Sequence, residues 1–218
     1  MSRAVFFYSS LVGQKLIMAV TGVILYLWVV GHLLGNLQIF SGPERLNAYA
    51  ALLKNLGEVL WAERGVMLLA LLLHLIASVR VTLADWQARP AGYSEKKSIE
   101  TTYAARTMII SGPIIFFYLI YHLMMFTYLT TGPGYSETDV YRNVVQAFQV
   151  PAISVVYILA MLLLGFHLYH GGWSMLQTLG VTWPSRPGLR WRLFPLLAVL
   201  ITLGYISIPV AVLAGIIR

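Results

Sequence analysis

The sequence predicts an all-α protein: a bundle of five transmembrane helices that forms one membrane domain over residues 1–218. Of the 218 residues, 59% are hydrophobic and only 11% are charged, whereas soluble domains carry about 25% charged residues. Long stretches without Asp, Glu, Lys or Arg recur along the chain, and a span needs about 20 mainly apolar residues. These observations exclude a soluble globular enzyme, a disordered chain and a fibrous repeat.

The uncharged stretches place the spans. Residues 143–185 are uncharged but too long for one span. Pro151 is placed at the beginning of the helix within them, because proline is tolerated in a first helical turn. The predicted helices are about 15–40, 63–85, 105–131, 151–178 and 192–215.

The segments between the spans carry weaker signals. The segment 41–62 contains small or apolar residues near helical spacing, namely Leu46, Ala50, Leu53, Leu56 and Leu60, which predicts a short helix on the membrane surface. Residues 86–104, with Pro, Gly and several charges, form the main connection on the opposite side. Glu58 and Glu63 are interpreted mainly as solvated loop charges, with a role in proton exchange at a quinone site as the alternative.

The basic residues predict the orientation. Five spans place the two termini on opposite sides of the membrane, and basic residues concentrate on the cytoplasmic side. With the N-terminus in the cytoplasm, the inner side holds two thirds of the 15 basic residues, namely Arg3, Lys15, Arg80, Arg89, Lys96, Lys97, Arg106, Arg186, Arg190 and Arg192. The net charge of +7 is then mostly a basic inner face, set by topology or used to dock a partner, and we expect no nucleic-acid binding.

All five histidines lie in predicted spans: His32, His74, His122, His167 and His170. Ionisable groups within a bilayer are costly and mark function by default. Since successive helices run in opposite directions, the helical rise places His32 and His122 about 25 Å from the inner boundary and His74 about 9 Å from it. His167 also lies toward the inner end of its helix. The spacing predicts two layers of two histidines.

Two facing imidazoles at one depth suit axial ligation of a haem iron, and two layers imply two haems. An iron with both axial positions filled transfers electrons, and hydrogen bonds to each ligand's Nδ1 are expected to orient the ring. Zinc fits less well because it prefers four clustered ligands. A proton relay or transporter remains an alternative.

His167 and His170, at i and i+3, compete for one position, and their spacing does not choose between them. With no cysteine in the chain, c-type haem and protein-bound iron–sulfur clusters are excluded.

Small and basic residues near the histidines have two interpretations each. Four glycines adjoin histidines, namely Gly31, Gly35, Gly171 and Gly172, and a missing side chain admits either a flat macrocycle or a closely packed helix. Lys15 and Arg106, near the inner helix ends, are candidates for charge-assisted contacts to haem propionates or quinone, or simply determinants of topology.

Five stretches carry a likeness to a known family. They are Gly-Gln-Lys-Leu-Ile-Met-Ala-Val-Thr-Gly (13–22), Gly-His-Leu-Leu-Gly-Asn (31–36), Gly-Pro-Glu-Arg-Leu-Asn-Ala-Tyr-Ala (42–50), Phe-His-Leu-Tyr-His-Gly-Gly-Trp-Ser (166–174) and Leu-Gly-Val-Thr (179–182). In order and spacing, over nearly the whole chain, the sequence resembles the dihaem cytochrome b membrane anchor of succinate dehydrogenases and quinol:fumarate reductases (complex II), the type with one five-helix subunit.

The resemblance implies a ligand set and partners. It pairs His32 with His122 around one haem b and His74 with His167 around a second, leaving His170 as an extra residue. It implies a bacterial cytoplasmic membrane, menaquinone or ubiquinone as substrate, and two cytoplasmic partners, a flavoprotein with covalent FAD and an iron–sulfur subunit. The chain is then the quinone-reactive subunit, while the dicarboxylate chemistry belongs to the partners. The whole complex is a candidate dimer.

One position departs from part of this family. In one fumarate reductase branch, a Glu two residues before the fourth ligand is thought to carry protons across the membrane, and here that position is Gly165. A proton path of that type is therefore not expected. The alternative functions are a cytochrome b anchor of another quinone-linked oxidoreductase, such as a hydrogenase or formate dehydrogenase, and a haem-free transporter with a histidine relay.

Overall fold

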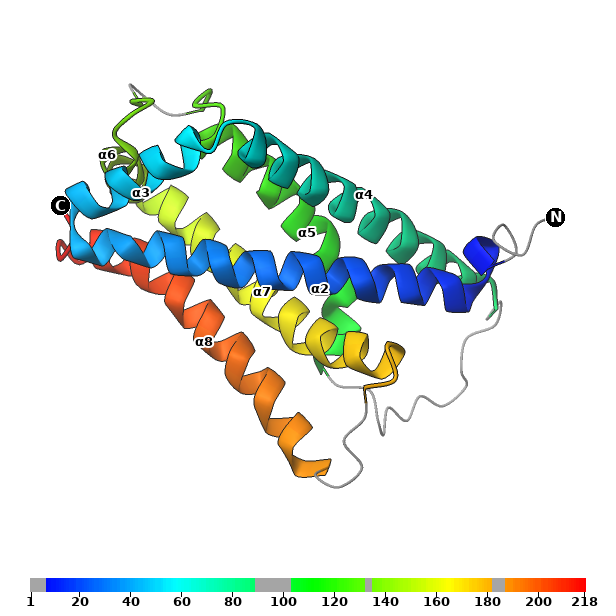
Figure 1. Cartoon of the computed structure of the whole chain (residues 1–218). Coiled ribbons are helices and arrows are strands. Elements are labelled where there is room, and N and C mark those ends of the chain that lie inside the picture. The colour runs from blue at the N-terminus through cyan, green and yellow to red at the C-terminus, as the bar shows by residue number, and fades with distance from the viewer. Residues whose placement is uncertain (1–6, 89–102, 132–134, 182–186) are drawn as a thin grey trace.

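The computed structural model describes residues 7–88, 103–131, 135–181 and 187–218. Within these ranges the chain is helical and has no strand (Figure 1). The elements are α2 (Leu11–Asn36), the 3-10 helix η1 (Leu37–Ser41), α3 (Pro43–Asn55), α4 (Glu58–Gln87), α5 (Tyr103–Phe126), α6 (Val140–Phe148), α7 (Pro151–Thr178) and α8 (Pro187–Leu213). In these ranges five helices (α2, α4, α5, α7 and α8) are long and apolar enough to cross a membrane. The predicted all-α transmembrane bundle is confirmed.

The helix boundaries differ from the predicted ones where local hydrogen bonds decide them. The first span begins at Leu11, because Ser10 caps it by accepting a hydrogen bond from the Gly13 amide at 3.0 Å. The third span ends at Phe126 instead of near 131, where the Thr127 and Tyr128 amides both bond the Leu123 carbonyl at 2.9 Å. The fourth helix has the predicted bounds, beginning at Pro151.

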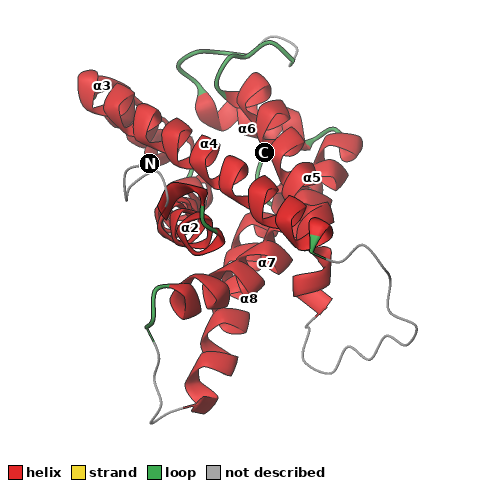
Figure 2. Ribbon diagram, turned by 90° about the vertical axis from the view of Figure 1, so that its right-hand side faces the viewer, coloured by secondary structure: helices red, strands yellow, loops and turns green. Residues whose placement is uncertain are grey.

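The packing order of the helices determines which side chains face one another. α2 packs against α4 and α7, and α7 also packs against α5 and α8. In Figure 2, α2 is seen end-on, and these helices are packed together as one bundle. Around the bundle, four of the five long helices therefore follow the order α4, α2, α7, α5. In this arrangement α2 and α5 are diagonal partners, as are α4 and α7.

One end of the bundle is covered by α3, α6 and the C-terminus, and we call it the capped end (Figure 1). The beginning of α2 lies at the opposite end. The Asn47 side chain joins the two short helices, because its Nδ2 donates to Asp139 Oδ1 at 2.9 Å and its Oδ1 accepts from the Tyr141 amide at 3.0 Å. The short helix predicted in 41–62 is present as α3, with Leu46 buried, but α6 was not predicted.

The opposite end carries basic residues of four spans. Lys15, Arg80, Arg106 and Arg192 all lie near the ends of their helices that point away from the cap. The basic residues Arg3, Arg89, Lys96, Lys97 and Arg186 lie outside the described residues, as does most of the connection 86–104. The side of the membrane that this end faces stays a prediction.

Candidate functional site

The structure brings four of the five histidines together as two pairs. The ring centroids of His32 on α2 and His122 on α5 are 5.9 Å apart. Those of His74 on α4 and His167 on α7 are 6.4 Å apart. Each pair spans a diagonal of the bundle. The first pair is toward the capped end and the second toward the opposite end, in the two layers that the helical rise predicts, while a role as ligands remains a prediction.

The spacing of both pairs fits a metal ion held between two imidazoles. Metal–imidazole bonds of about 2.0 Å on either side of one ion hold the two ring centroids roughly 6 Å apart. Both measured separations are close to this value. Within the described residues there is no cluster of three or more His, Asp or Glu side chains able to hold a metal. Among the described residues the histidines thus meet as two separate pairs, the arrangement that axial ligation of two haems would need.

His74 is oriented by two oxygen acceptors on α2. Its Nδ1 lies 3.1 Å from the Met18 carbonyl and 3.2 Å from Thr21 Oγ1. The Thr21 hydroxyl donates its own proton to the Ile17 carbonyl at 2.7 Å. Because both neighbours accept, the His74 proton belongs on Nδ1, and the Nε2 lone pair is available for a metal.

His122 is oriented by a hydroxyl on α7. Its Nδ1 lies 3.3 Å from the Tyr157 hydroxyl, and this hydroxyl donates to Met125 Sδ at 3.5 Å. Because the hydroxyl has a single proton, it accepts from His122 when that proton goes to Met125 Sδ, and Nε2 of His122 is then the free donor atom. Neither Met18 nor Tyr157 was identified from the sequence, since the relative rotation of two helices is not visible in residue spacing.

The other member of each pair is held differently. In the described part of the chain, His167 Nδ1 is buried without a hydrogen-bond partner. Buried polar atoms are normally satisfied, and His167 differs here from the expectation that each ligand's Nδ1 has a hydrogen bond. The His32 ring stacks on Trp28, with centroids 4.6 Å apart and planes 11° from parallel.

The remaining predicted site residues belong to neither His pair. His170 is half-buried, and it takes part in none of the ring contacts or hydrogen bonds found among the described residues. Lys15 and Arg106 are exposed near the first turns of α2 and α5. The structure thus places His167, and not His170, opposite His74.

The glycines near the histidines divide into two groups. A Cβ on Gly35 would lie 2.7 Å from the Tyr49 ring of α3, and one on Gly172 would collide with the Phe194 ring of α8. These two glycines admit neighbouring protein, which is the helix-packing interpretation. A Cβ on Gly31 or Gly171 would meet no atom within 4 Å, so both faces are open.

Glu63 is the clearest correction to the sequence analysis. It lies inside α4, which begins at Glu58, and it is half-buried instead of being a solvated loop charge. Its Oε1 accepts a hydrogen bond from Trp28 Nε1 on α2. The carboxylate is thereby linked through the indole to the His32 ring.

Aromatic side chains surround the pair at the capped end. The rings of Tyr118, Phe126 and Tyr157 lie 5.5–6.0 Å from His122. Phe126 also stacks on Tyr135, 6.3 Å away. In the described residues of the cap, Tyr135 Oη and Gln146 Oε1 are buried polar atoms without a partner.

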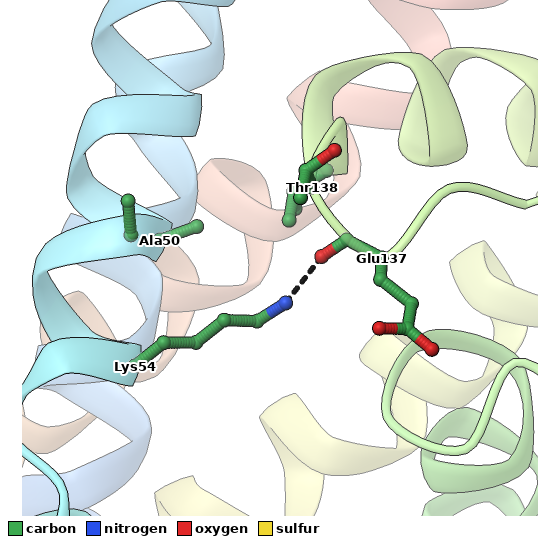
Figure 3. A pocket seen from close by; sticks show the side chains of 6 residues that line it. Ala50, Lys54, Glu137 and Thr138 are labelled. Carbon is green, nitrogen blue, oxygen red and sulfur yellow. Dashed lines mark hydrogen bonds between the residues drawn. The ribbon is translucent and has the colours of Figure 1, made fainter.

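Among the described residues, one hollow lies at the capped end and another between α2 and α4. One of about 70 Å³ at the capped end is lined by Ala50, Lys54 and Glu137 among others, and Lys54 Nζ donates to the Glu137 carbonyl (Figure 3). The other, of about 260 Å³, has an apolar lining of residues from α2 and α4 that includes Thr21. Neither is lined by a histidine.

Together, the described helices and histidines define a class of protein: a multi-pass transmembrane helical bundle with two diagonal imidazole pairs. Comparison with family models, with curated proteins and with solved structures finds no match.

Proposed function

We propose that this chain is the dihaem cytochrome b membrane anchor of a succinate dehydrogenase or quinol:fumarate reductase. The observation that carries the proposal is the pair of His–His separations, 5.9 and 6.4 Å, on diagonals of one bundle. The resemblance of five stretches, from 13–22 to 179–182, supports the same assignment.

The protein's own residues supply the ligands and their orientation. Each haem, when bound, supplies a one-electron carrier whose axial positions are both filled. His32 with His122, and His74 with His167, would hold the two irons. The Met18 carbonyl and the Tyr157 hydroxyl can accept from Nδ1 of His74 and His122, which would leave Nε2 of each ring to hold the metal. The apolar spans exclude water from both pairs.

The quinone reaction is proposed for the capped end. A quinone head group needs hydrogen-bond partners in an apolar setting. Tyr135 Oη can donate to a quinone oxygen, and Gln146 brings an amide to the same cap; both have buried atoms without a partner in the described structure. Phe126 connects Tyr135 to the His122 ring, which keeps the head group close to the first His pair.

The opposite end is proposed to face the cytoplasm and the soluble partners. Its basic residues, Lys15, Arg80, Arg106 and Arg192 among them, follow the positive-inside rule. The partners would be a flavoprotein that interconverts succinate and fumarate and an iron–sulfur protein. Electrons then pass between quinone at the cap and the iron–sulfur partner through the two His pairs.

A difference spectrum of the purified protein tests this function. Reduced-minus-oxidised spectra are expected to show low-spin b haem at two per chain, and a flavoprotein and an iron–sulfur protein are expected to co-purify. The absence of haem would contradict the proposal and favour a haem-free histidine relay. Haem with different partner enzymes would instead assign the chain to another quinone-linked oxidoreductase.

A further inference from the structure

Trp28 and Glu63 form a two-residue support behind His32. The indole of Trp28 stacks on the imidazole at 4.6 Å and 11°. The Trp28 Nε1 atom donates to Glu63 Oε1 on the neighbouring helix α4. The plane of the imidazole is thus linked, through one ring contact and one hydrogen bond, to a carboxylate on a different helix.

The support belongs to the His pair at the capped end. His122, the opposite ring, is held from α7 by the Tyr157 hydroxyl. The planes of His32 and His122 are 89° apart, whereas those of His74 and His167 are 56° apart. In the first pair, therefore, each ring is fixed from a different side of the bundle, and the two planes are perpendicular.

The position of Glu63 within a span indicates that its hydrogen bond with Trp28 has a functional role. A carboxylate within a span is costly unless it is hydrogen-bonded. Glu63 is half-buried in the second turn of α4, while Glu58 in the first turn is exposed. A helix pair such as α2 and α4 needs no carboxylate to associate, since small residues and apolar packing suffice.

We infer that Glu63, acting through Trp28, is a positioning residue that holds the His32 plane perpendicular to that of His122. The inference rests on the proposed haem ligation and extends it to a residue that touches neither metal nor substrate. Neighbours beyond the ligands orient ligand rings in metal sites generally. Here the neighbour would set the angle between two axial ligands.

That angle has a spectroscopic consequence. Each axial imidazole interacts through its π system with the iron d orbital that lies perpendicular to the ring plane. Perpendicular rings interact with two different d orbitals to the same extent, so these orbitals stay close in energy. Parallel rings both interact with the same d orbital, which separates the two orbitals in energy. For a low-spin ferric iron, splitting these orbitals lowers the largest g value of its electron paramagnetic resonance signal. The g value therefore reports the ring angle, independently of turnover.

The test compares four variants of the haem-loaded protein. Glu63→Leu removes the acceptor, Glu63→Gln keeps an amide oxygen to accept from Trp28, Trp28→Phe keeps a stacking ring without the N–H, and Glu58→Leu removes the exposed acid one turn earlier. In Glu63→Leu and Trp28→Phe we expect the largest g value of one ferric signal to fall and the other signal to stay unchanged. Glu63→Gln and Glu58→Leu are expected to match the unmodified protein.

The outcomes separate this inference from the proposed function. If the unmodified protein contains two haems and both signals are unchanged in Glu63→Leu and Trp28→Phe, the positioning role is wrong while the haem assignment stands. If Glu63→Leu does not assemble, an unchanged signal in Trp28→Phe overturns the role by itself. A shift in Glu58→Leu as large as that in Glu63→Leu would also overturn it. An unmodified protein without haem overturns both proposals.

Discussion

The hydroxyl of Tyr157 lies between His122 Nδ1 and Met125 Sδ, within hydrogen-bond distance of both. His122 Nδ1 is 3.3 Å from the hydroxyl oxygen, and Met125 Sδ is 3.5 Å from it. With a metal on Nε2, the neutral His122 ring would carry its proton on Nδ1, so the Tyr157 hydroxyl would accept from it and donate to Met125 Sδ. A hydrogen bond that the imidazole donates increases the electron density on its other nitrogen. A ferric iron bound there is stabilised relative to a ferrous one.

Removing this acceptor is expected to raise one haem potential. Only the difference in strength of this hydrogen bond between the ferric and ferrous states shifts the potential, so a bond worth about 1 kcal/mol sets an upper limit of about 40 mV for one electron in Tyr157→Phe. The haem at His122 should shift upward within that limit in a potentiometric titration, and the haem at His74 should not. Tyr118→Phe is the matched control, because its ring also contacts His122 but its hydroxyl is not hydrogen-bonded to it in the described structure. A downward shift in Tyr157→Phe would contradict the direction of the bond.

The choice between His167 and His170 gives a second prediction. His167 is opposite His74, and His170 is one turn further along α7. We expect His167→Ala to remove one of the two haem bands and His170→Ala to leave both in place. The haem content per chain, measured by the pyridine haemochrome method, checks this. The reverse result would mean that the ligand assignment is wrong.

The acid behaviour of the cap follows from Asp139. The Arg142 amide, and then the Asn47 side chain, hold the pKa of this carboxyl below its ordinary value of 3.8 by hydrogen-bonding its charged form. A lowered pKa in the folded state stabilises the cap fully above that ordinary value and less as the pH falls through the folded pKa. Hydrogen exchange of the α6 amides should accelerate, relative to Asp139→Asn, only below about pH 4. Identical pH profiles in both proteins would contradict this.

The quinone proposal predicts a binding defect at Tyr135. Its hydroxyl is buried without a partner in the described structure, and its ring stacks on Phe126. Loss of one hydrogen bond worth about 1 kcal/mol should raise the KM for quinone about fivefold in Tyr135→Phe, with unchanged haem spectra. Tyr128→Phe, in the exposed segment after α5, should leave the KM unchanged. An unaltered KM in Tyr135→Phe would place the head group elsewhere.

The sequence predicts the depth of each histidine well, because depth along a helix depends only on a constant rise per residue. His32 with His122, and His74 with His167, accordingly meet in the expected layers. What stacks on or bonds to each ring depends on how the helices are rotated about their axes, which residue spacing does not determine. Trp28, Tyr157 and the Met18 carbonyl were therefore not identified.

At the capped end, too, one feature is predictable from the sequence and another is not. The helix α3 is visible in the periodicity of Leu46 and its neighbours. The helix α6 has only nine residues, and its register depends on Asn47, which is distant in sequence and bonds both Asp139 and the Tyr141 amide. Glu63 was misinterpreted for a related reason: α4 begins at Glu58, earlier than the uncharged stretch indicates.

Gly165 permits a close approach of α7 to α8 and excludes a longer side chain. A Cβ at this position would collide with Thr202 Oγ1, which is held by its hydrogen bond to the Ala198 carbonyl at 2.7 Å. A Glu side chain at position 165 would collide with α8. The close packing of α7 against α8 therefore agrees with the absence of an acidic proton carrier at this position. We expect Gly165→Ala to destabilise the fold by about 1–3 kcal/mol in detergent unfolding, and Gly165→Ala with Thr202→Ala to recover most of the loss. Gly171→Ala, where a Cβ meets no atom within 4 Å, is the control, and an equal loss of stability there would show that the effect does not come from Thr202.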